Sequence, residues 1–402
     1  VTGFSMTPVL AMICGGIKVD DAGNPVGPAA LTQMFRQAMR ELSTEMRVKL
    51  IIYKLFDRYV LSGLEELYRE LNGELVAAAE SAGWDAIFAA EAWGSDAFTP
   101  LAWWGRETSR VRLGTSIVQM SGRAPTSIAM HALTLDHLSN GRMILGMGVS
   151  GPQVVEGWYG QPFAKPLART REVVEIIRKV LAREAPVTNA GPHYPLPYSG
   201  EGSVGLGKPL KLINHPVRER IPVLLAALGP KNVELAAEIA EGWQPIFFLP
   251  EKADNVWGAA LAAGTAKRDP VLGQLEVFAG PVLAIGDNVE PLREFVKPHL
   301  ALYIGGMGAK GKNFYHALAT SYGYGPEADR IQELYLAGEK DAAAKAVPDD
   351  LVRDVSLIGS AGFVKERVDA FRAAGVTTLN VVPIAESPAA RVKLIEQLRG
   401  LV

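Results

Sequence analysis

The chain has 402 residues, 48% of them hydrophobic, and a formal net charge of -2. This length and apolar content predict a soluble enzyme-sized protein, with one large domain of about 250 to 350 residues and a smaller appendage. The near-neutral charge provides no basic surface for nucleic acid or an anionic membrane, so neither is an expected partner. The single cysteine, Cys14, excludes an internal disulfide and is consistent with a cytoplasmic location.

The N-terminal part of the chain differs in pattern from the rest. The stretch RVKLIIYKLFDRYVLSGLEELYRELNG, residues 47–73, opens with an apolar alternation that is compatible with a strand. Its apolar residues then continue at spacings of three and four, which predicts a helix over the whole stretch. We therefore expect a helical N-terminal extension over residues 1–73 and a main domain over residues 74–402.

In the main domain, short β-rich runs alternate with helical periodicity, an order typical of parallel sheets with helical crossovers. We expect strands at residues 84–90, 111–119, 142–148, 222–227, 243–248, 275–285 and 377–384. Most are continuous apolar runs, as in strands that are buried on both faces. Two long Gly-rich and Pro-rich insertions, 185–221 and the region around 303–325, are expected to form lids or walls of a site.

Several glycine-containing turns follow the predicted strands. They lie in AEAWGSDAFTPLAWWG, RVRLGTSIVQ, TLDHLSNGR, LGMGVSGPQVVEGWYGQPFAKPLARTRE, GPHYPLPYSGEGSVGLGKPLK and LALYIGGMGAKGKNF. Turns at the carboxyl ends of parallel strands are where such folds assemble ligand sites. GMGVSG alone is a weak signal, because Gly-x-Gly after a strand is often a tight turn.

Taken together and in this order, these segments resemble the luciferase-like monooxygenase family, in particular its branch of oxidoreductases that use the deazaflavin coenzyme F420. The resemblance implies an α/β fold, a (β/α)8 TIM barrel of the bacterial luciferase-like type, with the cofactor at the carboxyl ends of the strands. It also implies hydride transfer between coenzyme F420 and a small organic substrate, and a homodimer. Residues from about 20 to 73 resemble instead a fragment of a proteobacterial family of unknown function, so the barrel is expected to lack its own first strand.

Two other functions stay open at this point. An FMN-dependent monooxygenase on the same fold would need a flavin reductase as a partner, and flavin and deazaflavin share their ring shape and ribityl phosphate. A non-catalytic fusion or remnant would instead act through its N-terminal helices.

The resemblance also assigns residues to the cofactor. It implies a non-prolyl cis peptide between Ser116 and Ile117, within a bulge behind the ring. The helix that follows the 222–227 strand would present its N-terminal amides to the cofactor phosphate. The expected cofactor-binding residues are Ser116, Ile117, Gly148, Val149, Ser150, Ala227, Leu228, Gly229, Pro230, Lys231 and Asn232.

Glu91, Trp93 and Asp96 are the candidate catalytic residues, since they follow the 84–90 strand at the expected mouth of the barrel. An equal alternative for Glu91 is a structural role beside a backbone turn. The histidine and glutamate that act in the sugar-phosphate dehydrogenases of this family are replaced here by Ala92 and Gly151, so that acid–base pair is not carried over. The six histidines show no metal-ligand spacing, and no metal is expected.

Overall fold

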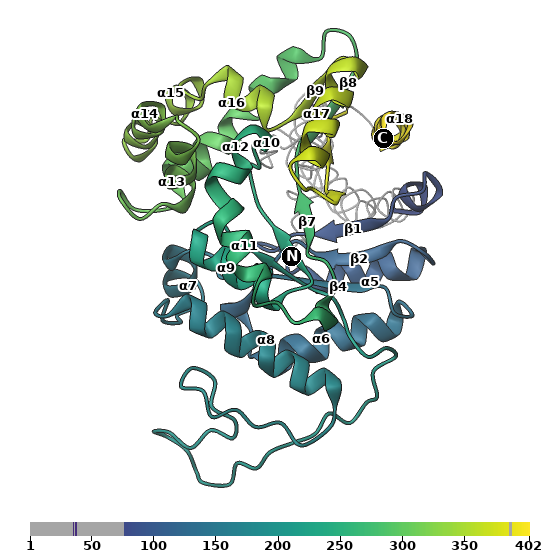
Figure 1. Cartoon of the computed structure of the whole chain (residues 1–402), viewed down its shortest axis with the longest axis vertical. Coiled ribbons are helices and arrows are strands. Elements are labelled where there is room, and N and C mark those ends of the chain that lie inside the picture. The colour runs from purple at the N-terminus through teal and green to yellow at the C-terminus, as the bar shows by residue number, and fades with distance from the viewer. Residues whose placement is uncertain (1–34, 36, 38–75, 386–387) are drawn as a thin grey trace, which may run out of the picture.

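The computed structural model describes residues 76–385 and 388–402, together with Phe35 and Gln37 (Figure 1). The predicted helix over residues 47–73 and the predicted domain boundary after residue 73 lie outside the described residues. The main domain, in contrast, is described almost throughout.

A curved sheet of parallel strands forms the centre of the described domain (Figure 1). Its order is β1 (Ala86–Ala89), β2 (Arg112–Thr115), β4 (Met143–Gly148), β5 (Val223–Ala226), β6 (Gly242–Gln244), β7 (Glu276–Ala279) and β10 (Thr378–Leu379). The short strand β3 (Val118–Gln119) follows β2 and pairs with β4. Within residues 76–385 and 388–402, β1 and β10 are the two ends of this path, and no strand joins them.

A second, three-stranded sheet extends the last strands of the curl. It consists of β8 (Val282–Ile285), which pairs with β9 (Leu357–Gly359) on one side and with β11 (Val382–Pro383) on the other. Every predicted strand therefore has a counterpart in the structure. Only β9 was not predicted from the sequence.

Helices fill the connections between the strands, and some of them cover the outer face of the curved sheet (Figure 1). They are α5 (Phe98–Glu107), α6 (Pro125–Leu138), α7 (Pro152–Gly157), α8 (Pro166–Ala182), α9 (Pro230–Ile239), α10 (Pro250–Ala253), α11 (Ala259–Thr265), α12 (Lys297–Ala301), α13 (Phe314–Ser321), α14 (Gly325–Leu336), α15 (Lys340–Lys345), α16 (Asp349–Asp354), α17 (Ala361–Ala373) and α18 (Pro388–Leu401). Proline occupies the first turn of α6, α8 and α9, where its missing N–H has no cost.

The inside of the curl has its own small apolar cluster. Ile144, Leu224 and Phe278 are each about 1% exposed, and Phe88 packs on them with its ring edge-on to Phe278 at a centroid distance of 6.0 Å. These side chains come from β4, β5, β7 and β1. They fill the interior of the sheet below the carboxyl ends of the strands.

The end of α6 and the start of β4 are held by a polar network. Asp136, which is fully buried, pairs with Arg218 at 2.7 Å. Arg142 donates to three backbone carbonyls of the α5–β2 connection, while the Ser139 hydroxyl accepts from the backbone N–H of Arg142. Asp136, Ser139 and Arg142 thus form a network at the end of a helix and the start of a strand.

The two predicted insertions take different forms. Residues 185–221 form a long extended loop below α8 in Figure 1. Three of its apolar side chains are more than four-fifths exposed, those of Val204, Leu206 and Ile213. The region around 303–325 is mostly helical instead. It contains α13 and a π-helical turn, Leu302–Gly306.

Candidate active site

One row of residues crosses the carboxyl ends of four neighbouring strands. The register pairs Gln119 with Gly148, Gly148 with Ala226, and Ala226 with Gln244. Residues that pair across parallel strands place their side chains on the same face of a sheet. In this row, Gly148 lies on the inner face, since it is four residues beyond the interior residue Ile144. At the mouth of the curl, two small residues, Gly148 and Ala226, therefore lie between two amide side chains. We call this row of four residues the bed.

A backbone bulge presses against this bed. The Ser116–Ile117 peptide bond is cis, as the sequence predicted, and it separates β2 from β3. A Cβ atom at Gly146 would lie 2.0 Å from the carbonyl oxygen of Thr115, and one at Gly148 would lie 2.6 Å from Cδ1 of Ile117. Glycine is required at Gly146 because a backbone atom occupies the space that a side chain would need, whereas at Gly148 the Ile117 side chain would have to move.

Polar groups in the bed are only partly satisfied. The hydroxyl oxygen of Ser116 accepts from the side-chain amide of Gln244 and, at 3.5 Å, from that of Asn380. The side-chain oxygens of Gln119 and Gln244 are both buried without a hydrogen-bond partner. Buried polar atoms are normally paired, so two orphaned acceptors at one bed fit a ligand that brings N–H donors. A flat heterocycle with a lactam edge, such as a flavin or a deazaflavin, matches both the bed and these acceptors.

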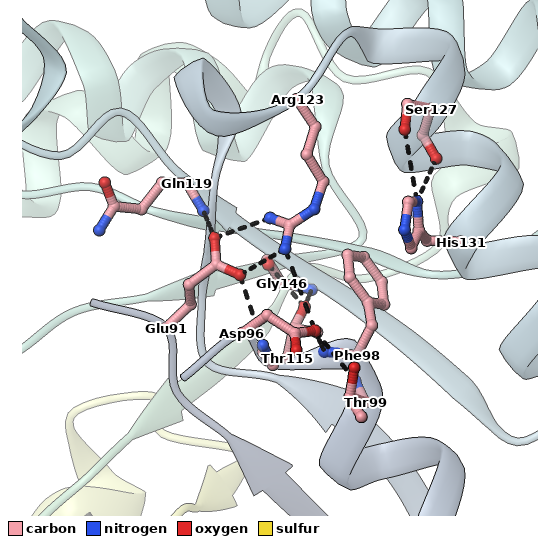
Figure 2. A network of polar contacts seen from close by, with 11 residues as sticks. Glu91, Asp96, Phe98, Thr99, Thr115, Gln119, Arg123, Ser127, His131 and Gly146 are labelled. Atoms are coloured by element: carbon pink, nitrogen blue, oxygen red, sulfur yellow. Dashed lines mark hydrogen bonds and ion pairs between the residues drawn. The ribbon is translucent and has the colours of Figure 1, made fainter. Parts of the chain in front are cut away.

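Glu91 and Arg123 form a buried ion pair at the end of β1 (Figure 2). Each guanidinium nitrogen donates to one oxygen of the Glu91 carboxylate at 2.8 Å. The same carboxylate also accepts from the backbone N–H groups of Ala97 and Gln119 at 3.4 and 3.3 Å. The hydrogen bond to Glu91 raises the pKa of Arg123 above its ordinary value. Glu91 thus joins three segments of the mouth, and its oxygens are fully engaged.

The other two candidate catalytic residues lie around this pair in different ways. One Asp96 oxygen accepts from the first backbone N–H groups of α5, those of Phe98 and Thr99, at 2.9 and 3.0 Å (Figure 2). The same oxygen is 4.0 Å from Arg123. The Trp93 side chain is 53% exposed. The structure therefore brings Glu91 and Asp96 together around Arg123, a residue that the sequence analysis did not single out, and leaves Trp93 open to solvent.

The turn after β4 opens onto a small pocket beside the bed. Val149 lines this pocket together with Met120, Ser121, Arg169 and Tyr194, while Ser150 has a left-handed backbone with φ of 58°. The Arg169 guanidinium lies over the Tyr194 ring at 5.5 Å from its centroid. A cationic side chain within this pocket suits an anionic part of a ligand.

Two buried tryptophans donate hydrogen bonds to the backbone of the turn after β5. The indole N–H of Trp243 donates to the carbonyl oxygen of Ala227 at 2.9 Å, and that of Trp257 donates to Leu228 at 2.8 Å. Both side chains are at most 1% exposed. The carbonyls of this turn therefore point away from the mouth, toward the tryptophans, and α9 begins directly afterwards with Gly229 as its N-cap.

Lys231, on this helix start, is committed to a surface ion pair. Its amine lies 2.8 Å from the Glu234 carboxylate, and its side chain is 78% exposed. Glu234 also pairs with Lys267 at 2.5 Å. Lys231, one of the residues predicted to bind the cofactor, therefore already has a structural partner. The other predicted residues of this helix start are Gly229, which is the N-cap, and Pro230 and Asn232, which lie in the first turn.

Replacing Trp257 by Phe is expected to weaken cofactor binding about tenfold, because the Leu228 carbonyl loses its buried donor and the turn loses one of its two anchors. Equilibrium titration with the cofactor, followed by fluorescence, measures the change. Trp158, which is 65% exposed, provides the matched control, and Trp158→Phe is expected to bind as the unaltered protein does. Unchanged affinity in Trp257→Phe would contradict a role of this turn in binding.

No group of three or more possible metal-ligating side chains was found among the described residues. In the same part of the chain, no helix is long and apolar enough to cross a membrane.

Comparisons with known proteins agree with this geometry. The model of a family described as luciferase-like monooxygenase matches residues 60–378, and the N-terminal domain of a family described only as a protein of unknown function matches residues 6–79. A Mycobacterium tuberculosis protein, provisionally named a coenzyme F420-dependent oxidoreductase, is 54% identical over 315 residues, which cover 77% of this chain and 90% of that protein. A 5,10-methylenetetrahydromethanopterin reductase of Archaeoglobus fulgidus is 26% identical, over 70% of this chain and 78% of its own length.

Solved structures show the same fold. The coenzyme F420-dependent tetrahydromethanopterin reductase from Methanopyrus kandleri superposes with a TM-score of 0.68 at 22% identity, covering 82% of this chain and 94% of that chain. An F420-dependent secondary alcohol dehydrogenase superposes with a TM-score of 0.65 at 16% identity and the same coverage. The fold is thus that of an α/β-barrel-type protein whose parallel strands end together at the mouth described above. The chain belongs to the luciferase-like monooxygenase family, as the resemblance predicted.

Proposed function

We propose that the protein is an oxidoreductase that binds coenzyme F420 and transfers a hydride between it and a small organic substrate. The observation that carries the proposal is the bed at the mouth of the curl. There, the small residues Gly148 and Ala226 lie beside the cis-peptide bulge and between two buried amide oxygens without hydrogen-bond partners. The 54% identity to a protein named for this cofactor supports it. When bound, the deazaflavin would supply the hydride chemistry, and the protein would supply position.

The residues of this chain have distinct roles in the proposed site. The side-chain oxygens of Gln119 and Gln244 would accept hydrogen bonds from the ring edge, while Ile117 in the bulge would press on one ring face. The start of α9 at Gly229 would hold the phosphate through its backbone amides and the positive end of the helix. The ion pair of Glu91 with Arg123 would fix the backbone around this arrangement.

Glu91 fits a positioning role better than proton transfer. Both of its oxygens accept from Arg123 and from backbone N–H groups, so the carboxylate has no oxygen left for a substrate. Of the two interpretations that the sequence left open for Glu91, the proposal therefore takes the structural partner of the mouth.

Titration of the purified chain with oxidised coenzyme F420 and, separately, with FMN tests the proposal. We expect saturable binding of F420 and at least about tenfold weaker binding of FMN, followed by protein fluorescence. Tighter binding of FMN would point to the monooxygenase alternative, with a flavin reductase as partner. Failure to bind either cofactor would contradict the enzyme function and favour the non-catalytic alternative.

A further inference from the structure

Four aromatic side chains, which we call the aromatic wall, gather beyond the carboxyl end of β6. They are Phe247 from the segment after β6, His299 from α12, Tyr303 from the π-helical turn and Tyr315 from α13. The ring of Tyr303 lies 4.7 Å from those of His299 and Tyr315, and 5.4 Å from that of Phe247, measured between centroids. All four belong to connections that leave the carboxyl ends of strands, the same end as the bed. Phe247 is only three residues beyond Gln244.

The backbone holds these rings in unusual conformations. Phe247 has a positive φ of 52°, which is rare for a bulky residue, and the Tyr322 hydroxyl donates to its carbonyl oxygen at 2.9 Å. Tyr303 lies in a π-helical turn, a feature frequent at functional sites. Conformations of this kind cost free energy and persist where the surrounding structure fixes them.

A buried asparagine joins two of the rings. Asn313 is 5% exposed, and its side-chain amide donates to the carbonyl oxygen of Tyr303 at 2.9 Å. The oxygen of the same side chain accepts from the backbone N–H of Tyr315, also at 2.9 Å, and caps α13. The spacing of Tyr303 and Tyr315 is therefore set before any ligand arrives.

The polar side chains of the aromatic wall are uncharged and make no hydrogen bond to other described groups. Within the described residues, no hydrogen bond joins the ring nitrogens of His299 or the hydroxyls of Tyr303 and Tyr315 to another group. His299 is open to solvent on one side, but the neighbouring rings desolvate it, and this desolvation lowers its pKa to about 4. Desolvation also raises the pKa of Tyr303 and of Tyr315. All three side chains are thus uncharged near pH 7.

No charged side chain belongs to the wall. The cation nearest to His299 along α12, Lys297, is engaged by Glu294 and Asp349, each at 2.6 Å. Against the rings themselves, a charged ligand would lose its hydration without gaining a counter-charge, and the two lysines of the connection between Tyr303 and Tyr315, Lys310 and Lys312, are exposed to solvent. The wall offers apolar ring surface together with hydrogen-bonding groups that carry no charge.

We propose that the aromatic wall binds the substrate, and that the substrate is a neutral, flat organic compound with one carbonyl or hydroxyl oxygen, such as an aromatic ketone or its alcohol. The rings contact the flat body of the compound, and His299 with Tyr303 hydrogen-bonds its oxygen. The inference rests on the proposed function, because the wall follows the same strand ends as the bed that would hold the cofactor, with Phe247 three residues beyond Gln244.

The test uses acetophenone and 4-acetylbenzoate, which share the ring and the carbonyl and differ by one carboxylate. Binding of each to the F420-loaded chain is measured by calorimetry. We expect saturable binding of acetophenone and at least about tenfold weaker binding of 4-acetylbenzoate. His299→Phe and Tyr303→Phe keep a ring but remove the hydrogen-bonding group, and each is expected to weaken acetophenone binding about fivefold to tenfold.

His316→Gln is the matched control, since His316 is in the same connection but pairs with Asp329 at 3.0 Å. It is expected to leave acetophenone binding unchanged, and circular dichroism with F420 titration checks that every variant is folded and loaded. Equal or tighter binding of 4-acetylbenzoate, absence of acetophenone binding, or unchanged binding in both ring variants would overturn the substrate-wall proposal. If F420 does not bind but acetophenone binds in a His299-dependent manner to the unloaded chain, the wall stands and the proposed cofactor is wrong.

Discussion

Replacement of Arg123 by Met is expected to lower the free energy of unfolding by about 3 to 5 kcal/mol, because it leaves the Glu91 carboxylate buried without its counter-charge. The Glu91 side chain is 3% exposed and that of Arg123 is 19% exposed, so water does not replace the lost partner. Urea denaturation followed by circular dichroism measures the loss. Cofactor affinity is expected to fall as well, since Glu91 no longer fixes the backbone at Ala97 and Gln119.

Arg106→Met provides the control for this prediction. Arg106 is 3.9 Å from Glu107 on the surface, and its side chain is 77% exposed. Loss of such a surface pair is expected to change the unfolding free energy by less than about 1 kcal/mol. The double variant Glu91→Gln with Arg123→Met is expected to be more stable than Arg123→Met alone, because it removes the unpaired buried charge. A single Arg123→Met variant as stable as the unaltered chain would show that the pair does not hold the mouth.

Gly146→Ala is expected to give the second large effect. The added Cβ would lie 2.0 Å from the carbonyl oxygen of Thr115, a backbone atom that cannot rotate away. The β2–β4 pair and the cis-peptide bulge would have to shift, at a cost of about 1 to 3 kcal/mol for the added methyl group. We expect this variant to lose cofactor binding more strongly than stability, because the shift falls on the bed.

Gly157→Ala is the matched control for Gly146→Ala, since a Cβ at Gly157 meets nothing within 4 Å. It is expected to change stability by no more than about 0.5 kcal/mol. Denaturant unfolding and F420 titration of both variants give the comparison. Normal cofactor binding by Gly146→Ala would mean that the contact between the bulge and β4 is not needed for the site.

Much of the fold could be predicted from local sequence. The buried strands are continuous apolar runs, and the prolines at 125 and 230 mark the helix starts that the structure shows. The strand β9 was missed because three residues, Leu357–Gly359, are too few to show a period. For the region around 303–325, its glycines suggested a loop, yet packing of Gly305 and Gly306 against Tyr335 favours a helix.

The candidate site was only partly predictable. The cis peptide at Ser116–Ile117 and the bed residue Gly148 followed from family resemblance. Gln119 and Gln244, in contrast, become neighbours of the bed only through strand register, which local pattern does not give. The aromatic wall had no local signal either, since its rings come from four separate segments.

The bed and the wall differ in how freely they can change during evolution. At the bed, the shape is made by residues with little or no side chain, and a Cβ atom at the neighbouring Gly146 would meet the backbone carbonyl of Thr115. Three of the four rings of the wall, those of His299, Tyr303 and Tyr315, lie on the helical connection after β8, where one ring can replace another while the barrel stays the same. Exchanging residues 297–321 between relatives should therefore transfer substrate preference without altering the cofactor, which makes this segment the natural unit for redesigning the enzyme.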